Sequence, residues 1–242
     1  ETIFPGSGFI EMMWAVKEVL GVEGSLENIL FTLPLFIPKK GEVKIQIKAE
    51  EKEAGVHKLS VYSQIKDESN STWQEHASGI FNGKILDIPT DSLHSFEKVQ
   101  KISLNKLYEN FATKGLIFGT SFQGLKESYE SKDCTLSHIK TPAVVKTENY
   151  HLHPALLDAC FQTLELNIKN NHENKHDRVY LPFAIGEYQL FSLPSLDFWA
   201  QTKNVSKNNE LVKADLNLYD NNGFCFAKVN DLQVKAADAK SL

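Results

Sequence analysis

Apolar and polar residues alternate along the chain with two different periods, and the first stretch has the period of a helix. Its apolar residues recur every three or four positions: Phe9, Met13, Val16 and Leu20. This spacing places them on one face of a helix from Ser7 to Leu20. Pro5 and Ser7 are start signals, and Gly21 is a stop signal. The pattern therefore predicts one mostly buried helix.

The next stretches have the period of a strand. Apolar residues alternate with lysine and glutamine over residues 43–48, and Leu59 and Val61 repeat the pattern. A further run extends from Trp73 to Ile85. Turn-like residues separate these runs at 39–41 and 67–70. We expect half-buried antiparallel strands.

The same order of elements restarts after a polar segment. Between Asp87 and Gln100 the chain turns polar, and we assign residues 89–104 as a linker between a first unit at 1–88 and a second at 105–242. The second unit is expected to contain helices at Leu107–Thr113 and from Pro154 to about Ile168, and strands at Leu125–Tyr129, Cys134–Ile139, Tyr188–Phe191, Phe198–Asn204, Leu211–Tyr219 and Phe224–Val234.

Each half thus carries one apolar helix introduced by a proline and several strands, which indicates a two-copy α+β fold. The simplest arrangement is a double hot dog, in which two curved antiparallel sheets each wrap round a central helix. Two such copies side by side would form one continuous sheet with a groove between the halves. Composition alone does not choose this fold over another α+β fold.

Composition and charge limit the class of function. A chain of 242 residues is long enough for a sizeable core, and its net charge of −5 offers no basic field for nucleic acid. The most apolar stretch, Ile29 to Ile37, is too short to span a membrane and contains Pro34. The three cysteines are far apart and form no C-x-x-C pair, which favours a reducing, cytoplasmic environment.

The run from His151 to Gln162 carries the clearest chemistry. Pro154 suits the first turn of a helix, which places Asp158 one turn in, beside the apolar face formed by Leu157, Phe161, Leu164 and Ile168. Gln162, four residues later, is positioned to hydrogen-bond the Asp158 carboxyl. A carboxyl near apolar groups favours its protonated form and can act as an acid. The alternative is that Asp158 and Gln162 form only the solvated side of a surface helix.

Four stretches together resemble one family, the dehydratase domains of polyketide synthases. They are Ile3–Met12, which is similar to the end of the family's first signature; Gly115–Leu125, which is similar to its Gly-Tyr-x-Tyr-Gly-Pro-x-Phe stretch; His153–Gln162, which is similar to its second signature; and Leu181–Gly186, which matches its Leu-Pro-Phe-x-x-Gly stretch. Their order and spacing also follow the family, and the resemblance covers nearly the whole chain.

The sequence departs from the family pattern at two positions. In the first signature a histidine stands nine residues before the proline, and counting back from Pro5 places it about five residues upstream of Glu1, outside this sequence. The family's Tyr-Gly-Pro step is Phe118-Gly119-Thr120 here, so an apolar ring replaces a phenol.

The resemblance implies a double hot-dog dehydratase that eliminates water from a 3-hydroxyacyl thioester. Asp158 would be the catalytic acid, Gln162 and His153 would support it, and the expected substrate-binding residues are Pro5, Gly6, Phe118, Gly119, Leu181, Pro182 and Phe183. Amides at the start of the first helix, near Gly6 to Gly8, would polarise the thioester carbonyl. No cofactor is expected to bind directly, because the acyl group is carried as a thioester on the phosphopantetheine of an acyl carrier protein.

The resemblance also implies partners. We expect the acyl carrier protein and neighbouring synthase domains as partners, no nucleic acid or membrane, and a homodimer as one assembly to test. Scattered lysines such as Lys101 and Lys106 are candidate contacts for an acidic carrier protein, although such lysines are usually solvated surface.

Other readings of the same residues stay open. A metal site at His151 and His153 lacks a third ligand at suitable spacing, and Cys160 fits a buried thiol better than a nucleophile. A relative on this fold that shifts a double bond or closes an oxygen ring is an alternative, although such double-bond shifters commonly lack the aspartate found at Asp158. A double hot dog that only binds acyl chains is the non-catalytic alternative.

Overall fold

A computed structural model describes residues 2–65, 72–84, 87, 89–90, 92–93, 100–131, 134–167, 178–208 and 211–238. The predicted turn at 67–70, much of the predicted linker and the end of the second helix at Ile168 lie outside the described residues. No helix among the described residues is long and apolar enough to cross a membrane.

The first predicted helix is confirmed as α1, Gly6–Leu20. Pro5 precedes it in an extended conformation, and no side chain caps its first turn. Gly21 ends it with a left-handed φ of 65°, a conformation that glycine adopts without a Cβ clash. The helix buries its apolar face against the strands of the first half, including Phe9, Ile10 and Met13.

The first half contains four longer strands and a small two-stranded sheet. They are β2 (Gly24–Phe31), β4 (Val43–Glu53), β5 (Val56–Ile65) and β6 (Gln74–Gly83), with β1 (Thr2–Ile3) paired to β3 (Phe36–Ile37). The alternating pattern did not predict β2. Asn28 has a positive φ of 52°, and the pairing of β2 with β6 shifts between Glu27 and Leu30. This irregularity breaks the period-two pattern by which a strand is recognised in sequence.

The second half repeats the plan with more strands. Its elements are β7 (Gln100–Ile102), α2 (Leu107–Thr113), the short 3₁₀ helix η2 (Thr120–Phe122), β8 (Leu125–Glu130), β9 (Cys134–Lys140), α3 (Pro154–Asn167), β10 (Arg178–Leu190), β11 (Asp197–Lys207), β12 (Leu211–Tyr219) and β13 (Cys225–Asp238). Strand β7 falls inside the predicted linker, and β10 begins well before the strand predicted from Tyr188. The first part of β10 was not predicted because it contains Pro182, and a proline inside an apolar run argues against a strand. In the structure Pro182 lies at a bulge before Ala184.

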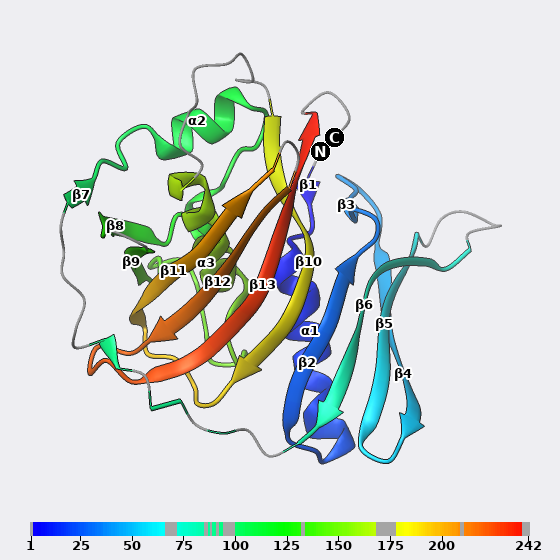
Figure 1. Cartoon of the computed structure of the whole chain (residues 1–242). Helices are drawn as coiled ribbons and strands as arrows, with labels where there is room; N and C mark the ends of the chain where they lie inside the picture. Colours follow the sequence, from blue (N-terminus) through cyan, green and yellow to red (C-terminus); the bar gives the residue numbers. More distant parts are fainter. Residues whose placement is uncertain are drawn as a thin grey trace.

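Strands β2 and β10 pair across the two halves and join them into one antiparallel sheet of eleven strands, in the order β4-β5-β6-β2-β10-β13-β12-β11-β9-β8-β7. Figure 1 shows this sheet curving round α1 in one half and α3 in the other. The predicted arrangement of one continuous sheet with a helix in each half is therefore confirmed, whereas the proposed unit boundaries remain a prediction.

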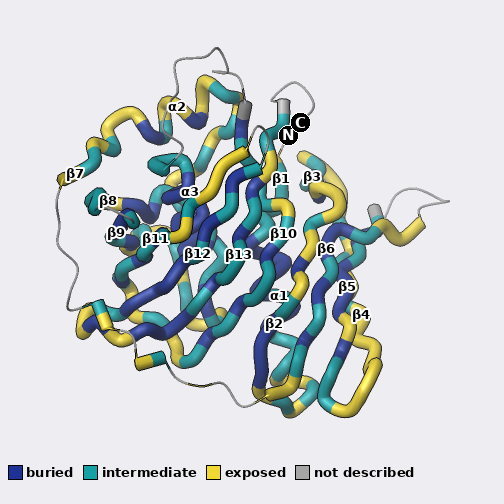
Figure 2. The backbone as a smooth tube through the Cα atoms, viewed as in Figure 1, coloured by how far each residue is buried: buried dark blue, intermediate teal, exposed yellow. Residues whose placement is uncertain are grey.

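The two helices pack together in the middle of the molecule, where burial is greatest (Figure 2). Trp14 of α1 is 1% exposed, and its ring packs edge to face on Tyr188 of β10 with the ring centroids 5.1 Å apart. A buried aromatic pair that joins the halves makes a common core, so the two units are expected to unfold together.

Candidate active site

Asp158 lies on the second turn of α3, at the boundary between helix surface and core. The residue is partly buried, and its neighbours Leu157 and Ala159 are fully buried. Burial raises the pKa of its carboxyl to about 6, whereas the hydrogen bond from Gln162 acts in the opposite direction. Asp158 is therefore an acid whose pKa lies near neutral pH, as a proton donor requires.

Gln162 holds the Asp158 carboxyl, as the sequence predicted. Its Nε2 donates to Asp158 Oδ2 at 3.0 Å and also to the carbonyl oxygen of Phe122 at 3.0 Å. Gln162 is only 5% exposed, and its Oε1 is buried without a hydrogen-bond partner among the described residues. The residue is thus no part of a solvated face, and it fixes Asp158 to the loop before β8.

The loop at residues 115–124 brings Phe118 against α2. The Phe118 ring meets Phe111 at 4.9 Å and Tyr108 at 6.3 Å, both edge to face, and Gln123 Nε2 donates to the Phe118 carbonyl oxygen at 3.0 Å. A Cβ added at Gly119 would meet nothing within 4 Å, so this backbone is openly accessible. The predicted residues Phe118 and Gly119 therefore lie on the loop that Gln162 binds.

Glu11 of α1 connects the first half to the segment that begins α3. One carboxylate oxygen accepts from the His151 amide at 2.8 Å and lies 3.2 Å from His151 Nδ1, and the other accepts from the Leu152 amide at 3.2 Å. His151 Nε2 also lies 3.0 Å from Glu18 Oε1. No pattern in the sequence predicted this role. The available signal was a lone acid, Glu11, inside the apolar face of a helix.

His153 has a local structural role at the start of α3. Its Nδ1 accepts from the Ala155 amide at 3.1 Å, and its ring packs edge to face on Tyr150 at 4.4 Å. Burial lowers the pKa of His153, and the charge of Glu11 opposes that change. An imidazole acting as an acceptor is neutral. The expected support of Asp158 by His153 stays a prediction, because the hydrogen bond of His153 is to the Ala155 amide.

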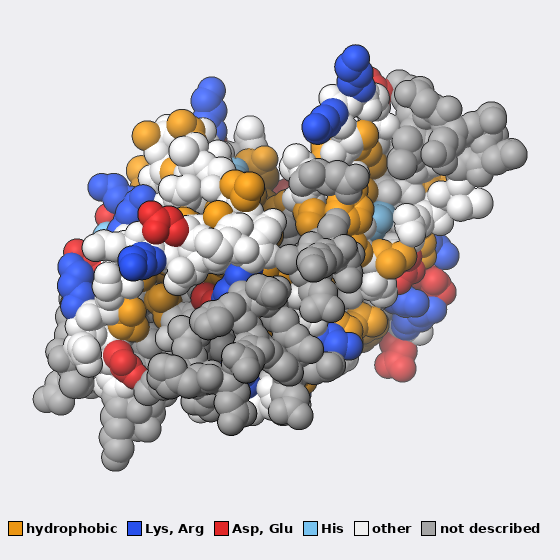
Figure 3. Space-filling view, turned by 90° about the horizontal axis from the view of Figure 1, so that it is seen from above, with side chains coloured by type: hydrophobic (Ala, Val, Ile, Leu, Met, Phe, Trp, Pro, Cys, Tyr) orange, Lys and Arg blue, Asp and Glu red, His pale blue; other side chains and the backbone are white. Residues whose placement is uncertain are grey.

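The predicted residues at the chain start and on β10 lie side by side. A Cβ added at Gly6 would lie 3.6 Å from Pro182 Cβ and 3.4 Å from the ring of Phe31. Phe183, at the bulge of β10, is 39% exposed. Figure 3 shows apolar side chains reaching the surface at several places on the upper face. None of the hydrogen bonds or ring contacts given for the described residues links Pro5, Gly6 or Pro182 with Asp158.

One expectation for α1 is wrong in part. The Gly8 amide is not free to polarise a thioester carbonyl, because it donates to the Pro5 carbonyl oxygen at 2.9 Å. The helix closes its first turn by this contact, so Gly8 is not available to a ligand.

Two alternative chemistries lack support in the described parts of the chain. No group of three or more His, Cys, Asp and Glu side chains that could hold a metal ion occurs there. Cys160 is fully buried on α3, its Sγ lies 3.2 Å from the Leu156 carbonyl oxygen, and burial raises its pKa far above the usual range for a thiol. Such a thiol is inert, as the sequence predicted.

Asp158 has no histidine partner within the described ranges. His76, for example, is 2% exposed and bound to Ser63 Oγ at 2.7 Å and to the Leu33 carbonyl oxygen at 3.1 Å. The site therefore supplies an acid and its supports, and leaves the base to be assigned.

Two family profiles match the sequence. Residues 94–242 match the profile described as "Polyketide synthase dehydratase N-terminal domain", and this match alone covers more than half of the chain. Residues 1–64 match the profile described as "Polyketide synthase dehydratase domain".

Curated relatives are long synthases. Polyketide synthase GfsE of Streptomyces halstedii is 27% identical over 188 residues, which are 75% of this chain and 5% of that protein. Mycoketide-CoA synthase of Mycobacterium tuberculosis is 28% identical over 188 residues, which are 76% of this chain and 4% of that protein. The chain thus spans only a small part of these relatives.

Solved structures share the fold over the full chain. The dehydratase domain from the CurK module of curacin polyketide synthase is 29% identical, with a TM-score of 0.84 over 99% of this chain and 85% of that chain. A CurJ dehydratase is 24% identical, with a TM-score of 0.90 over 99% and 84% of the two chains, which shows a shared fold. These similarities confirm the predicted double hot dog. Inactive mutants of the CurK dehydratase carry either a His-to-Phe or an Asp-to-Asn replacement.

Proposed function

Because the chain belongs to the polyketide synthase dehydratase family, we propose that it eliminates water from a 3-hydroxyacyl thioester carried on the phosphopantetheine of an acyl carrier protein. Asp158 is the acid of this reaction. The single observation that supports this role most strongly is its environment: a partly buried carboxyl with a pKa raised to about 6, held by Gln162 at 3.0 Å.

The reaction needs one base and one acid on the same substrate. A base removes the proton at the α-carbon, and the electron pair of that C–H bond forms the double bond to the β-carbon. The C–O bond at the β-carbon breaks, and the departing oxygen takes the Asp158 proton and leaves as water. The carboxylate that remains is stabilised by Gln162 Nε2. Before the next cycle the base releases its proton to solvent, and the Asp158 carboxylate takes up a proton from solvent.

We assign the base to the histidine that the family's first signature places nine residues before the proline, about five residues upstream of Glu1. The inactive His-to-Phe mutant of the CurK dehydratase supports a histidine of this kind in that protein. The family motif continues from this position into α1, the helix that contacts α3.

The remaining elements of the proposal concern binding. The thioester arm contacts the group formed by Pro5, Gly6 and Pro182, where apolar side chains meet. No directly bound cofactor takes part, and the carrier protein and neighbouring synthase domains deliver and receive the acyl group. Lys101 is a weak candidate for a carrier contact, because it already pairs with Glu127 at 3.1 Å.

Turnover with a carrier-bound substrate tests this proposal. The chain extended by its encoded upstream residues is incubated with a 3-hydroxybutyryl carrier-protein thioester, and loss of water is followed by mass spectrometry. We expect turnover that Asp158→Asn lowers by at least about a thousandfold while the fold is kept, since the Asp-to-Asn mutant of the CurK dehydratase is inactive. The chain that starts at Glu1 should be nearly inert. Unchanged turnover in Asp158→Asn would remove the assignment of the acid, and equal turnover from both chain lengths would remove that of the base.

A further inference from the structure

The hydroxyl of Tyr108 is a buried polar group that the mechanism above does not use. Tyr108 lies on α2, next to the buried Leu107, and its Oη is buried without a hydrogen-bond partner of normal geometry among the described residues. Burying a hydroxyl without a hydrogen-bond partner costs free energy. The unpaired Tyr108 hydroxyl is therefore a candidate for hydrogen bonding to a ligand.

This hydroxyl lies within the electrostatic range of Asp158. Burial raises the pKa of Tyr108 to about 12, the facing amide of Leu125 opposes the rise, and the charge of Asp158 adds to it. An amide can only donate to the phenol oxygen, so the phenol's own hydrogen stays unused. The free group is thus a hydrogen-bond donor.

The segment from Phe122 to Leu125 connects α2 with α3. Gln162 binds the Phe122 carbonyl oxygen at 3.0 Å, and a Cβ added at Gly124 would lie 3.2 Å from Ala159 Cβ, next to Asp158. Leu125 at the end of the same segment faces the Tyr108 hydroxyl. One short segment therefore contacts both the acid-bearing face of α3 and the phenol.

Two polar groups in the region of Asp158 lack a full set of partners. The Tyr108 hydroxyl has an unused hydrogen, Gln162 Oε1 is a buried acceptor without a partner in the described parts of the chain, and Asp158 is the proton donor of the proposed reaction. A ligand that both accepts and donates a hydrogen bond would satisfy the first two groups. An alcohol has this property.

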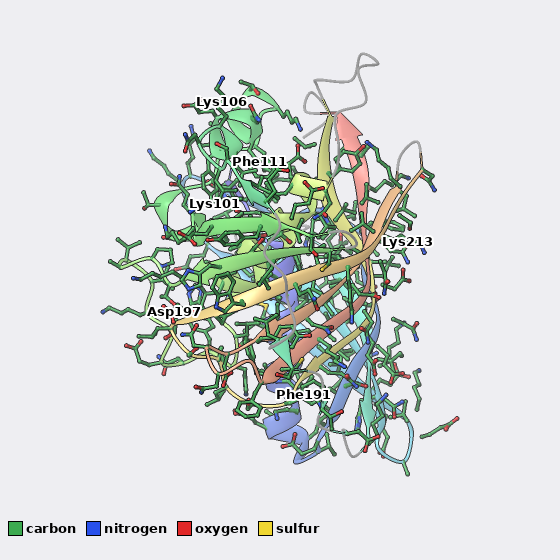
Figure 4. The ribbon with its side chains drawn as sticks, turned by 60° about the vertical axis from the view of Figure 1, so that its left-hand side comes forward. Lys101, Lys106, Phe111, Phe191, Asp197 and Lys213 are labelled. Atoms are coloured by element: carbon green, nitrogen blue, oxygen red, sulfur yellow. The ribbon has the colours of Figure 1, made fainter. Side chains whose placement is uncertain are left out.

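The aromatic cluster orients the phenol. The Tyr108 ring contacts Phe111 at 6.5 Å and Phe118 at 6.3 Å, and Phe111 is only 7% exposed. Figure 4 shows Phe111 directed inward from α2, whereas Lys106 points away from the body of the molecule. Phe118 has no hydroxyl, so Tyr108 is the phenol of this cluster.

Resting on the proposed function, we propose that the Tyr108 hydroxyl binds the 3-hydroxyl oxygen of the substrate and presents it to Asp158, with Gln162 Oε1 accepting the hydroxyl's hydrogen. Tyr108 thereby selects a 3-hydroxyacyl group over an acyl group that lacks the hydroxyl. It also holds the leaving oxygen while Asp158 transfers its proton.

Binding of two matched probes tests the assignment without turnover. The probes are 3-hydroxybutyryl-pantetheine amide and butyryl-pantetheine amide, which differ only in the hydroxyl and cannot react as thioesters. Isothermal titration compares the wild-type chain, including its upstream residues, with Tyr108→Phe and with the control Tyr129→Phe. The control removes a phenol on strand β8 that donates to Glu127 at 2.7 Å.

Tyr108→Phe should weaken binding of the hydroxy probe by about fivefold and leave the butyryl probe unchanged, whereas Tyr129→Phe should change neither. Adding Phe118→Tyr to Tyr108→Phe should restore part of the discrimination, because it places a phenol in the same cluster. Turnover should show a lower kcat in Tyr108→Phe and partial recovery in the double variant. Melting curves should stay close to wild type, because the lost hydroxyl has no described partner.

If Tyr108→Phe weakens binding of both probes equally, the residue has a packing role and the assignment is overturned. If Tyr108→Phe weakens binding of neither probe, the assignment is overturned as well. If wild type dehydrates the carrier thioester, Asp158→Asn does not, and Tyr108→Phe keeps full discrimination, only the Tyr108 assignment fails. If wild type shows no dehydration, the proposed function and the Tyr108 assignment fail together.

Discussion

The carboxylate of Glu11 is expected to hold the start of α3, and its removal should destabilise the protein. Glu11 is 8% exposed and accepts from two backbone amides, of His151 at 2.8 Å and of Leu152 at 3.2 Å, and Leu152 is fully buried. Hydrogen bonds to a charged group are worth about 1.5 to 3 kcal/mol each. Glu11→Ala should therefore lower the free energy of unfolding by about 3 to 6 kcal/mol, or Tm by on the order of 10 °C.

Glu18 provides the matched control, because it binds the same histidine from the surface. Its side chain is 70% exposed and lies 3.0 Å from His151 Nε2, so Glu18→Gln should cost less than about 1 kcal/mol. Urea unfolding followed by tryptophan fluorescence measures both variants, since Trp14 lies in the shared core. Turnover should also fall in Glu11→Ala, because the segment that positions Asp158 loses its support. Equal unfolding free energies for the two variants would refute this reasoning.

Two further predictions concern stability. The pKa of Asp158 is raised in the fold from 3.8 to about 6, so the stability that its proton contributes is present below pH 4 and is lost as pH rises through 6. The free energy of unfolding of Asp158→Asn should therefore exceed that of wild type by up to about 3 kcal/mol above pH 7 and should equal it below pH 4. Urea unfolding at a series of pH values measures this difference. A difference that does not vary with pH would be inconsistent with a buried carboxyl. Gly24→Ala should lower the free energy of unfolding by on the order of 3 kcal/mol, because its Cβ would lie 2.0 Å from the Asn82 carbonyl oxygen. Gly119→Ala should leave Tm unchanged, because its Cβ would meet nothing within 4 Å. Thermal melting compares the two, and a similar loss in both would contradict the geometry.

The elements with a regular period were predictable from the sequence. α1, α2 and α3 were predicted close to their observed bounds, and so were the strands whose alternation is unbroken, such as β9 and β12. Irregular strands were not, because Asn28 with its positive φ interrupts β2 and Pro182 lies at a bulge in β10. A period of two carries no information across a bulge.

The site was predictable only where both partners stand on one helix. The contact between Asp158 and Gln162 follows from a spacing of four residues, and it is present at 3.0 Å. The contact of Glu11 with His151 joins residues 140 positions apart, and the approach of Tyr108 to α3 depends on how the segment before β8 folds back. Sequence spacing cannot supply such long-range contacts. The structure corrected the role of Gly8 for a local reason, because its amide closes the first turn of α1.

The most direct test of the account is a crystal structure of the chain, with its upstream residues, bound to 3-hydroxybutyryl-pantetheine amide. The account predicts that the 3-hydroxyl oxygen lies within about 3.2 Å of a carboxyl oxygen of Asp158, with the α-carbon facing the upstream histidine. An acyl chain bound elsewhere, or an Asp158 carboxyl separated from the hydroxyl by the α3 side chains, would contradict it.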